Sequence, residues 1–180
     1  MKPAVILERD GILNLVQTQR NQPVSPLTLD TFAINEQAVE PIKELKAAGF
    51  LIIVTTNQPG LSRGVQSRRE LDLMHSILRR KFPIDDLFLC PHDEMDRCPC
   101  RKPKPGLIKE AIWKWQLDMD RSFVISDKWQ DAQAAHVVGC TSILLRSPWN
   151  GTGHYDFVLP DVPAIAQKIL HLAGSPALCA

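Results

Sequence analysis

The sequence predicts an α/β fold, a single Rossmann-like three-layer domain built on a mainly parallel sheet. Short apolar runs alternate along the chain with helical patterns, which is typical of a sheet covered by helices. The runs are continuously apolar, as expected for strands buried on both faces of a parallel sheet. At 180 residues, with no internal repeat or linker, the chain suits one domain.

Five apolar runs are the expected strands. They are Ala4–Leu7, Leu51–Thr55, Leu87–Cys90, Phe123–Ser126 and Ser142–Leu145. In open parallel sheets, ligands bind outside the carboxyl ends of the strands. The polar residues that follow these runs are therefore the candidates for a functional site.

Five helices are expected between and after the strands. The first, over 38–48, carries its apolar residues on one face and stops at Gly49. The second opens at Ser67, with Glu70 three residues later in the pattern of a capping box, and runs to about Phe82. The others are expected over 105–115, between Asp127 and Gly139, and over 162–173.

Three stretches rich in polar residues, Pro or Gly are expected to be loops: 17–28, 91–104 and 147–155. The first of them separates the first strand from the first helix and is too short for an inserted domain. We therefore expect a minimal cap, with 17–28 and the Cys-rich stretch forming a partial rim around an open site.

The composition excludes several classes of partner. The net charge is +1 and the apolar content is 44%, so the chain lacks the excess positive charge that binds nucleic acid or an anionic membrane. No apolar run approaches the length of a membrane span. Met1–Pro3 leads directly into a strand without a secretory pattern. We expect a cytoplasmic monomer whose partner is a small metabolite.

A group of cysteines and one histidine predicts a metal site. Cys90, His92, Cys98 and Cys100 fall within eleven positions and offer the full tetrahedral ligand set for Zn²⁺. Four protein ligands leave no open position, which indicates a structural site. The alternative is a set of free thiols in a surface loop. Of the other cysteines, Cys140 is expected to be a buried small residue.

Three carboxylates follow two of the strands. Glu8 and Asp10 are two residues apart, so on extended chain both side chains can face one cavity. Asp127 follows another strand and is expected at the same mouth. A cluster of oxygen ligands suits Mg²⁺. The alternative is that Asp10 and Asp127 only cap turns or helices, as Asp often does.

Polar and basic residues at neighbouring strand ends could bind phosphate. A hydroxyl and backbone N–H groups at a turn can hold phosphate oxygens, and Arg and Lys supply positive charge. A capped Pro-Gly turn and a solvated basic turn are the alternatives. The candidates are Thr56, Asn57, Gln58, Arg101, Lys102 and Lys128.

Taken together, the segments 8–11, 56–60, 90–103 and 126–131 resemble the motifs of phosphatases in the haloacid dehalogenase superfamily. The metal loop running into Arg-Lys-Pro is similar to the branch that contains histidinol-phosphate and heptose-bisphosphate phosphatases. The segment 57–64, Asn-Gln-Pro-Gly-Leu-Ser-Arg-Gly, resembles the heptose-bisphosphate enzymes more closely. Both branches stay open.

The resemblance implies a phosphatase domain over residues 1–175, with the Zn loop at 90–104 and a tail at 176–180. It implies that the carboxylate of residue 8 attacks phosphorus and that Asp10 is the general acid and base. It implies Mg²⁺ held by residue 8, the Asp10 carbonyl and Asp127. The remaining implied roles are phosphate binding by Thr56, Lys102 and Lys128, and binding of a second phosphate by Arg63 and Arg101.

Three departures from the motifs affect the functional prediction. Glu8 stands where the family has the nucleophilic Asp, and Ser126 stands where it has Gly. The stretch 17–25 lacks the Gly-Tyr element seen near this point in heptose phosphatases. Two hypotheses follow. The chain is either a phosphomonoesterase impaired by Glu8, acting on a small phosphorylated metabolite such as a sugar bisphosphate, or an inactive phosphosugar-binding relative.

Overall fold

The computed structural model describes residues 1–174. The tail expected at 176–180, with Cys179, lies outside the described residues. A six-stranded sheet has the order β5-β4-β1-β6-β7-β8, and each neighbouring pair is parallel. Its strands are β1 (Ala4–Glu8), β4 (Leu51–Asn57), β5 (Asp86–Cys90), β6 (Phe123–Ser126), β7 (Thr141–Leu145) and β8 (Phe157–Leu159).

The five expected strands are confirmed, with ends that differ by at most two residues. Strand β8 was not predicted, because it has only three residues and all three are partly exposed. It pairs with β7 at one edge of the sheet.

The five expected helices are also present. They are α1 (Val39–Ala47), α2 (Arg68–Lys81), α3 (Gly106–Trp115), α4 (Trp129–Val137) and α5 (Val162–Gly174). Short 3₁₀ helices are η1 (Leu29–Thr31), η2 (Glu36–Ala38), η3 (Glu94–Asp96) and η4 (Met119–Arg121). At the start of α2, the Ser67 hydroxyl accepts the Glu70 N–H at 3.1 Å as expected. The Glu70 carboxylate accepts the N–H of Leu29 at 2.8 Å, which ties the rim segment to α2.

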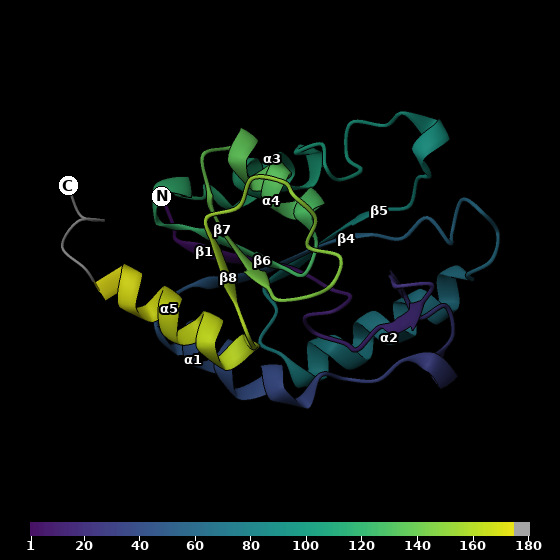
Figure 1. Ribbon diagram of the computed structural model, residues 1–180, viewed down its shortest axis with the longest axis horizontal. Helices are drawn as coiled ribbons and strands as arrows, with labels where there is room; N and C mark the ends of the chain where they lie inside the picture. Colours follow the sequence, from purple (N-terminus) through teal and green to yellow (C-terminus); the bar gives the residue numbers. More distant parts are fainter. Residues whose placement is uncertain (175–180) are drawn as a thin grey trace.

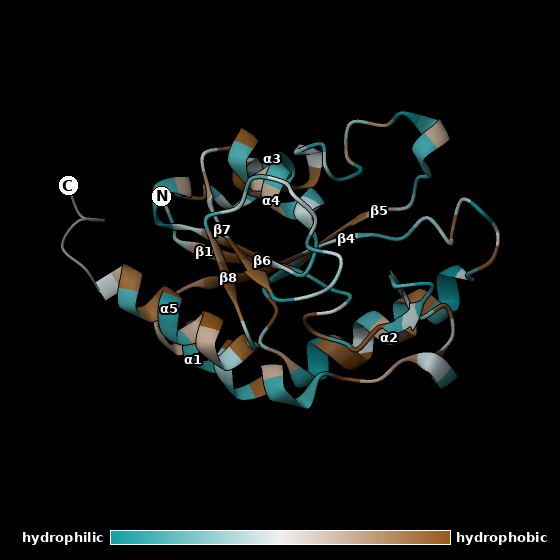
Figure 2. Ribbon diagram, in the orientation of Figure 1, coloured by the Kyte–Doolittle hydropathy of each residue, from teal (hydrophilic) through white to brown (hydrophobic). Residues whose placement is uncertain are grey.

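Helices cover both faces of the sheet, which confirms the three layers (Figure 1). Alternate residues of β1 point to opposite faces. Val5 and Leu7 lie in a core with α1, α2 and α5, whereas Ala4 and Ile6 lie in a second core with α3 and α4. The central parts of the sheet strands are apolar, and polar residues gather on the outer faces of the helices (Figure 2). The helices within residues 1–174 include none with the length and apolar character to span a bilayer.

The stretch 17–28 was expected to be a loop, and this was partly wrong. It contains an antiparallel hairpin of β2 (Gln17–Gln19) and β3 (Gln22–Val24). The two linking residues, Arg20 and Asn21, have φ of 48° and 59°, as in the tight turns that match the twist of a hairpin. Such turns usually carry Gly, and its absence here left the hairpin without a recognisable signal. The hairpin is small enough to agree with a minimal cap.

The strand order brings the polar strand ends together. β1 lies between β4 and β6, and Glu8 is level with Thr55 while Leu7 is level with Ile125. The chain therefore delivers the residues after β1, β4 and β6 to one point on the carboxyl edge. This is the position at which open parallel sheets bind ligands.

Candidate active site

A cavity of about 490 Å³ opens at the carboxyl edge of the sheet. It is bounded on one side by the ends of β1 and β4, and on the other by the metal loop and the start of α4. Its lining includes Glu8, Asp10, Asn57, Arg101, Lys102, Lys128 and Trp129. Ser25, directly after β3, also lines it, so the cavity joins residues from five separate segments of the chain.

Glu8 is held at both carboxylate oxygens. The side chain is buried, at 5% exposure. Its Oε1 accepts the backbone N–H of Arg9 at 2.8 Å and that of Asp10 at 3.3 Å. Its Oε2 accepts Lys102 Nζ at 2.5 Å. The carboxylate thus folds back over the turn that follows β1.

Lys102 is the central cation of the site. Its ammonium group is buried and donates to Glu8, to Asp131 Oδ1 at 2.5 Å and to the Thr55 carbonyl at 3.0 Å. Burial alone would lower the pKa of Lys102, but the charges of Asp131 and Glu8 raise it. The side chain of Asn57 holds the backbone of Lys102 at two points. Asn57 Oδ1 accepts the Lys102 N–H and Asn57 Nδ2 donates to the Lys102 carbonyl, both at 3.2 Å. The ammonium is therefore fixed in direction.

Asp131 is a site residue to which we assigned no role from the sequence. Burial raises its pKa to about 6, with Glu8 adding to the rise and Lys102 opposing it. Its Oδ2 accepts the Ser126 hydroxyl at 2.9 Å. Ser126, where the family has Gly, is therefore accommodated by a hydrogen bond to Asp131. The i,i+4 spacing from Asp127 was the available sequence signal.

Asp10 accepts hydrogen bonds at both oxygens. Oδ1 accepts Arg9 Nε at 2.9 Å and Asn14 Nδ2 at 3.0 Å, and Oδ2 accepts Gln58 Nε2 at 2.7 Å. Burial would raise its pKa, but the charges of Arg9 and Lys128 outweigh burial and lower the pKa to about 2. Gln58, expected to bind phosphate, thus holds Asp10 and also donates to the Thr56 hydroxyl at 2.9 Å.

Arg9 is fully buried beneath the turn and is a second residue without an assigned role from the sequence. Its guanidinium reaches Asp10 on one side and lies 3.3 Å from His75 Nε2 on the other. Burial and the charge of Arg9 lower the pKa of His75 to about 4. His75 is half-buried on α2 and supports the turn through its contact with Arg9.

Asp127 and Lys128 follow β6 and lie next to Asp10. Lys128 Nζ donates to the Asp10 carbonyl at 2.8 Å and to Asp127 Oδ1 at 2.7 Å. Burial would lower the pKa of Lys128, but Glu8, Asp127 and Asp10 raise it. A cation thus lies against two of the three oxygen groups expected to bind Mg²⁺. The oxygen-only donors of Glu8, Asp10 and Asp127 fit a hard divalent ion.

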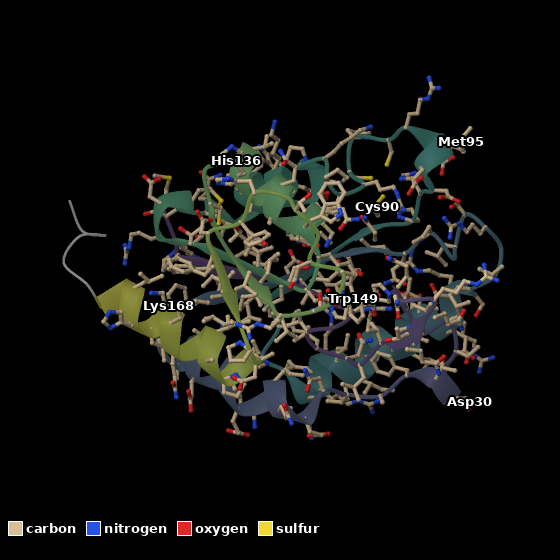
Figure 3. The ribbon with its side chains drawn as sticks, viewed as in Figure 1. Asp30, Cys90, Met95, His136, Trp149 and Lys168 are labelled. Atoms are coloured by element: carbon tan, nitrogen blue, oxygen red, sulfur yellow. The ribbon has the colours of Figure 1, made fainter. Side chains whose placement is uncertain are left out.

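The predicted metal loop brings its four ligand residues together. The ligand atoms of Cys90, His92, Cys98 and Cys100 all lie within 4.8 Å of one another, so the cluster could hold a metal ion. Figure 3 shows Cys90 on the inner side of this loop and Met95 at its outer tip. The set of three sulfurs and one imidazole fits tetrahedral Zn²⁺. Outside the loop, Cys140 is buried as expected.

The basic residues around the metal loop make hydrogen bonds to residues of that loop. Arg63 makes two hydrogen bonds to Asp93, at 2.5 and 2.7 Å. Arg101 lines the cavity and donates to the His92 carbonyl at 3.2 Å. Lys104 is exposed and donates to the carbonyls of Arg97 and Cys98. The phosphate-binding roles of Arg63 and Arg101 stay predictions.

Comparison with known proteins agrees with this geometry. A family model described as HAD-hydrolase-like matches residues 99–156. The chain is 34% identical over 145 residues to D-glycero-beta-D-manno-heptose-1,7-bisphosphate 7-phosphatase from Pasteurella multocida, covering 74% of this chain and 76% of that protein. It is 30% identical over 158 residues to the protein of the same name from Escherichia coli K12, covering 81% and 80%.

A solved structure is similar over nearly the whole chain. It is D,D-heptose 1,7-bisphosphate phosphatase from B. bronchiseptica, complexed with magnesium and phosphate. The TM-score is 0.82 at 28% identity, covering 95% of this chain and 99% of that chain. The fold and the site thus define a phosphatase of the haloacid dehalogenase class. Within that class, the chain belongs to the family of bacterial D-glycero-beta-D-manno-heptose-1,7-bisphosphate 7-phosphatases.

Gly11 allows the turn after β1 to approach Asp127, which generates the first prediction. Gly11 and Gly49 have φ of +94° and +96°, but a Cβ on Gly11 would lie 2.3 Å from Asp127 Oδ2, while one on Gly49 would meet nothing within 4 Å. Gly49→Ala should cost about 1 kcal/mol of unfolding free energy, from backbone strain alone. Gly11→Ala should cost more and should also weaken Mg²⁺ binding.

Denaturant unfolding and Mg²⁺ titration of both variants are the measurements. The Gly49 variant is the matched control for backbone strain. Equal losses of stability, with unchanged Mg²⁺ binding in both, would show that the approach to Asp127 is unimportant.

Proposed function

We propose that this chain is a Mg²⁺-dependent phosphomonoesterase that acts on a sugar bisphosphate resembling heptose 1,7-bisphosphate, with residues 1–175 as one phosphatase domain. The observation that carries the proposal is the convergence of Glu8, Asp10 and the Lys102 ammonium in one cavity, with Lys128 joining the Asp10 carbonyl to Asp127 beside it. The names of the relatives, and the magnesium and phosphate bound in one of them, support the substrate class and the cofactor. They favour the heptose over the histidinol branch.

In the proposed reaction, the carboxylate of residue 8 attacks phosphorus and forms an acyl-phosphate, and the sugar oxygen leaves. Asp10 must enter this step protonated, although the charges of Arg9 and Lys128 lower its pKa in the free chain; burial and the negative charge of a bound phosphate favour the protonated form. It then gives that oxygen its proton and takes one from the water that hydrolyses the intermediate. Its Oδ2, held by Gln58, is placed to exchange the proton, while Oδ1 stays on Arg9 and Asn14.

The negative charge of the phosphoryl group would be stabilised by protein donors and by the metal. Lys102, Thr56 and Lys128 supply donors to its oxygens. When bound by Glu8, the Asp10 carbonyl and Asp127, Mg²⁺ would neutralise part of its charge. Lys128 would then leave those two oxygens and turn toward the phosphate.

Glu8 reduces this activity for a geometric reason. The extra methylene of Glu moves the carboxylate by about 1 Å, and misplacement of that size can cost on the order of 100-fold in rate. Here the Glu8 carboxylate also accepts hydrogen bonds from the Lys102 ammonium and from the backbone N–H groups of Arg9 and Asp10. These contacts favour a second candidate function, in which the chain binds phosphosugars without hydrolysing them.

The metal loop is proposed to hold one structural Zn²⁺ through Cys90, His92, Cys98 and Cys100. Support comes from the complete ligand set and from the position of the residue that follows it. The Arg101 N–H donates to Cys98 Sγ at 3.4 Å, and Lys102 comes next in the chain. The metal would therefore fix the segment that delivers the central cation.

A second phosphate is proposed to lie at the metal-loop side of the cavity. Arg101 faces this space, and Arg63 is close to it through Asp93. Trp129, 37% exposed in the cavity wall, offers an aromatic face to a sugar ring between the two phosphates.

Restoring the family nucleophile tests the function. Glu8→Asp should raise phosphate release from a sugar bisphosphate with Mg²⁺ by about 100-fold, because the shorter carboxylate returns the nucleophile to its place. Phosphate release from a metabolite panel is the measurement, with Glu8→Asp/Asp10→Asn as the inactive control. If the unaltered chain and the Glu8→Asp variant are both inert, the enzyme proposal fails. If only the Glu8→Asp variant works, the present chain is a disabled form of the enzyme.

Removing one thiolate tests the metal loop. Cys98→Ser should lose Zn²⁺, as measured by elemental analysis, and should open residues 91–104 to limited proteolysis, because a three-ligand site no longer orders the loop. Cys140→Ser is the matched control, since it changes a buried cysteine outside the loop and should keep one Zn²⁺ per chain. An intact loop in metal-free protein would contradict the proposal.

The arginines test the second phosphate. On the Glu8→Asp form, Arg101→Ala should lower kcat/KM for a bisphosphate about tenfold more than for its monophosphate, because only the bisphosphate loses a charged hydrogen bond. Arg63→Ala should act in the same direction, and Arg68→Ala, an exposed arginine on α2, should change neither. If Arg63→Ala lowers both efficiencies by one factor, Arg63 does not contact the second phosphate.

A further inference from the structure

The loop after β7 holds Asp127 by hydrogen bonds from residues that lie outside the family motifs. Trp149 Nε1 donates to Asp127 Oδ2 at 2.7 Å. Ser147 Oγ and Asn150 Nδ2 both donate to the backbone carbonyl of Asp127 at 2.9 Å. Trp149 is half-buried and lines a pocket with Gly11 and Asp127; Figure 3 labels it. One short loop thus fixes both the main chain and one carboxylate oxygen of this acid.

The remaining contacts leave Asp127 a single oxygen for a metal. The residue is 1% exposed, so its carboxylate has little room. Oδ1 faces Lys128 Nζ at 2.7 Å, and the same ammonium lies 2.8 Å from the Asp10 carbonyl. Oδ2 points the other way, between the Trp149 indole and the close backbone of Gly11. Rotating the carboxylate to offer both oxygens would break the indole hydrogen bond.

The indole is well suited to this task. Its N–H can only donate, so it cannot itself become a metal ligand, and the ring has few rotatable bonds. A carboxylate that offers one oxygen suits Mg²⁺, which requires a compact octahedral shell at about 2.0–2.1 Å. Ca²⁺ takes more oxygens at longer distances and often binds both oxygens of a carboxylate.

We propose that Trp149 is a positioning residue that holds Asp127 as a one-oxygen ligand and thereby makes the site prefer Mg²⁺ to Ca²⁺. The inference rests on the proposed function, because the cation site is the one proposed there. It deepens that function by assigning metal choice to a residue that contacts neither substrate nor metal. Groups that hold a metal ligand in this way commonly change metal affinity by about 10- to 100-fold.

The test is calorimetric titration of the full Zn-loaded chain with Mg²⁺ and separately with Ca²⁺. Trp149→Phe keeps an aromatic ring and removes the N–H, and should lower the ratio of Mg²⁺ to Ca²⁺ affinity about tenfold. Trp113→Phe, at an exposed position (79%) on α3, is the matched control and should leave the ratio unchanged. Equal weakening of both metals by Trp149→Phe would overturn the proposal.

A measurement on the unaltered chain covers the case in which the Phe variant does not fold. Infrared difference spectra with and without Mg²⁺ should show a one-oxygen carboxylate band that is absent from Asp127→Asn. A two-oxygen band would overturn the proposal. If the unaltered chain binds no Mg²⁺ at all, the proposed function itself fails; if it binds Mg²⁺ but the ratio does not change in Trp149→Phe, only the role of Trp149 fails.

Discussion

The ammonium of Lys102 is the interaction on which the rest of the site depends. It is buried, and it joins Glu8 at the end of β1, the Thr55 carbonyl in β4 and Asp131 in α4. A buried charge is costly unless its partners are well placed, and removing one partner of such a group typically costs about 3–5 kcal/mol. Two carboxylates and one carbonyl around a single cation therefore lock three segments at one point.

The position of Lys102 explains why a metal loop stands beside a phosphatase site. Lys102 has no helix or strand of its own; it follows the last metal ligand, Cys100, by two residues. The segment between β5 and α3 is polar and carries one short 3₁₀ helix, so it lacks an apolar core to hold it. A metal held by the loop, together with the hydrogen bonds from Asn57, would supply the rigidity that packing does not.

Much of the fold could be predicted from the sequence because each buried strand is a continuous apolar run bounded by turn residues. Strand β8 could not, because its three residues are half-buried at the sheet edge and carry no such contrast with their surroundings. The β2–β3 turn, formed by Arg20 and Asn21, lacks the Gly that usually marks a hairpin. The hydrophobic pattern of a sequence reflects burial, so elements with little buried surface cannot be recognised from it. For the site, residue type and strand-end position were enough to single out Glu8, Asp10, Lys102 and Lys128, which line one cavity, and the Cys and His residues of the metal loop, which lie together. Their partners depend on distances across the fold, as when Trp149 reaches Asp127 from 22 residues away.

Glu8 shows how closely binding and turnover are related in this arrangement. A buried carboxylate at the end of β1 must be satisfied by hydrogen bonds, and here it uses two backbone N–H groups and Lys102. Those are the donors that an incoming phosphoryl group would need. An Asp at this position is shorter by one methylene and would leave part of this donor set to the phosphate. With Glu, the protein satisfies its own anion first, so in the proposed reaction the contacts that stabilise the folded site would oppose turnover.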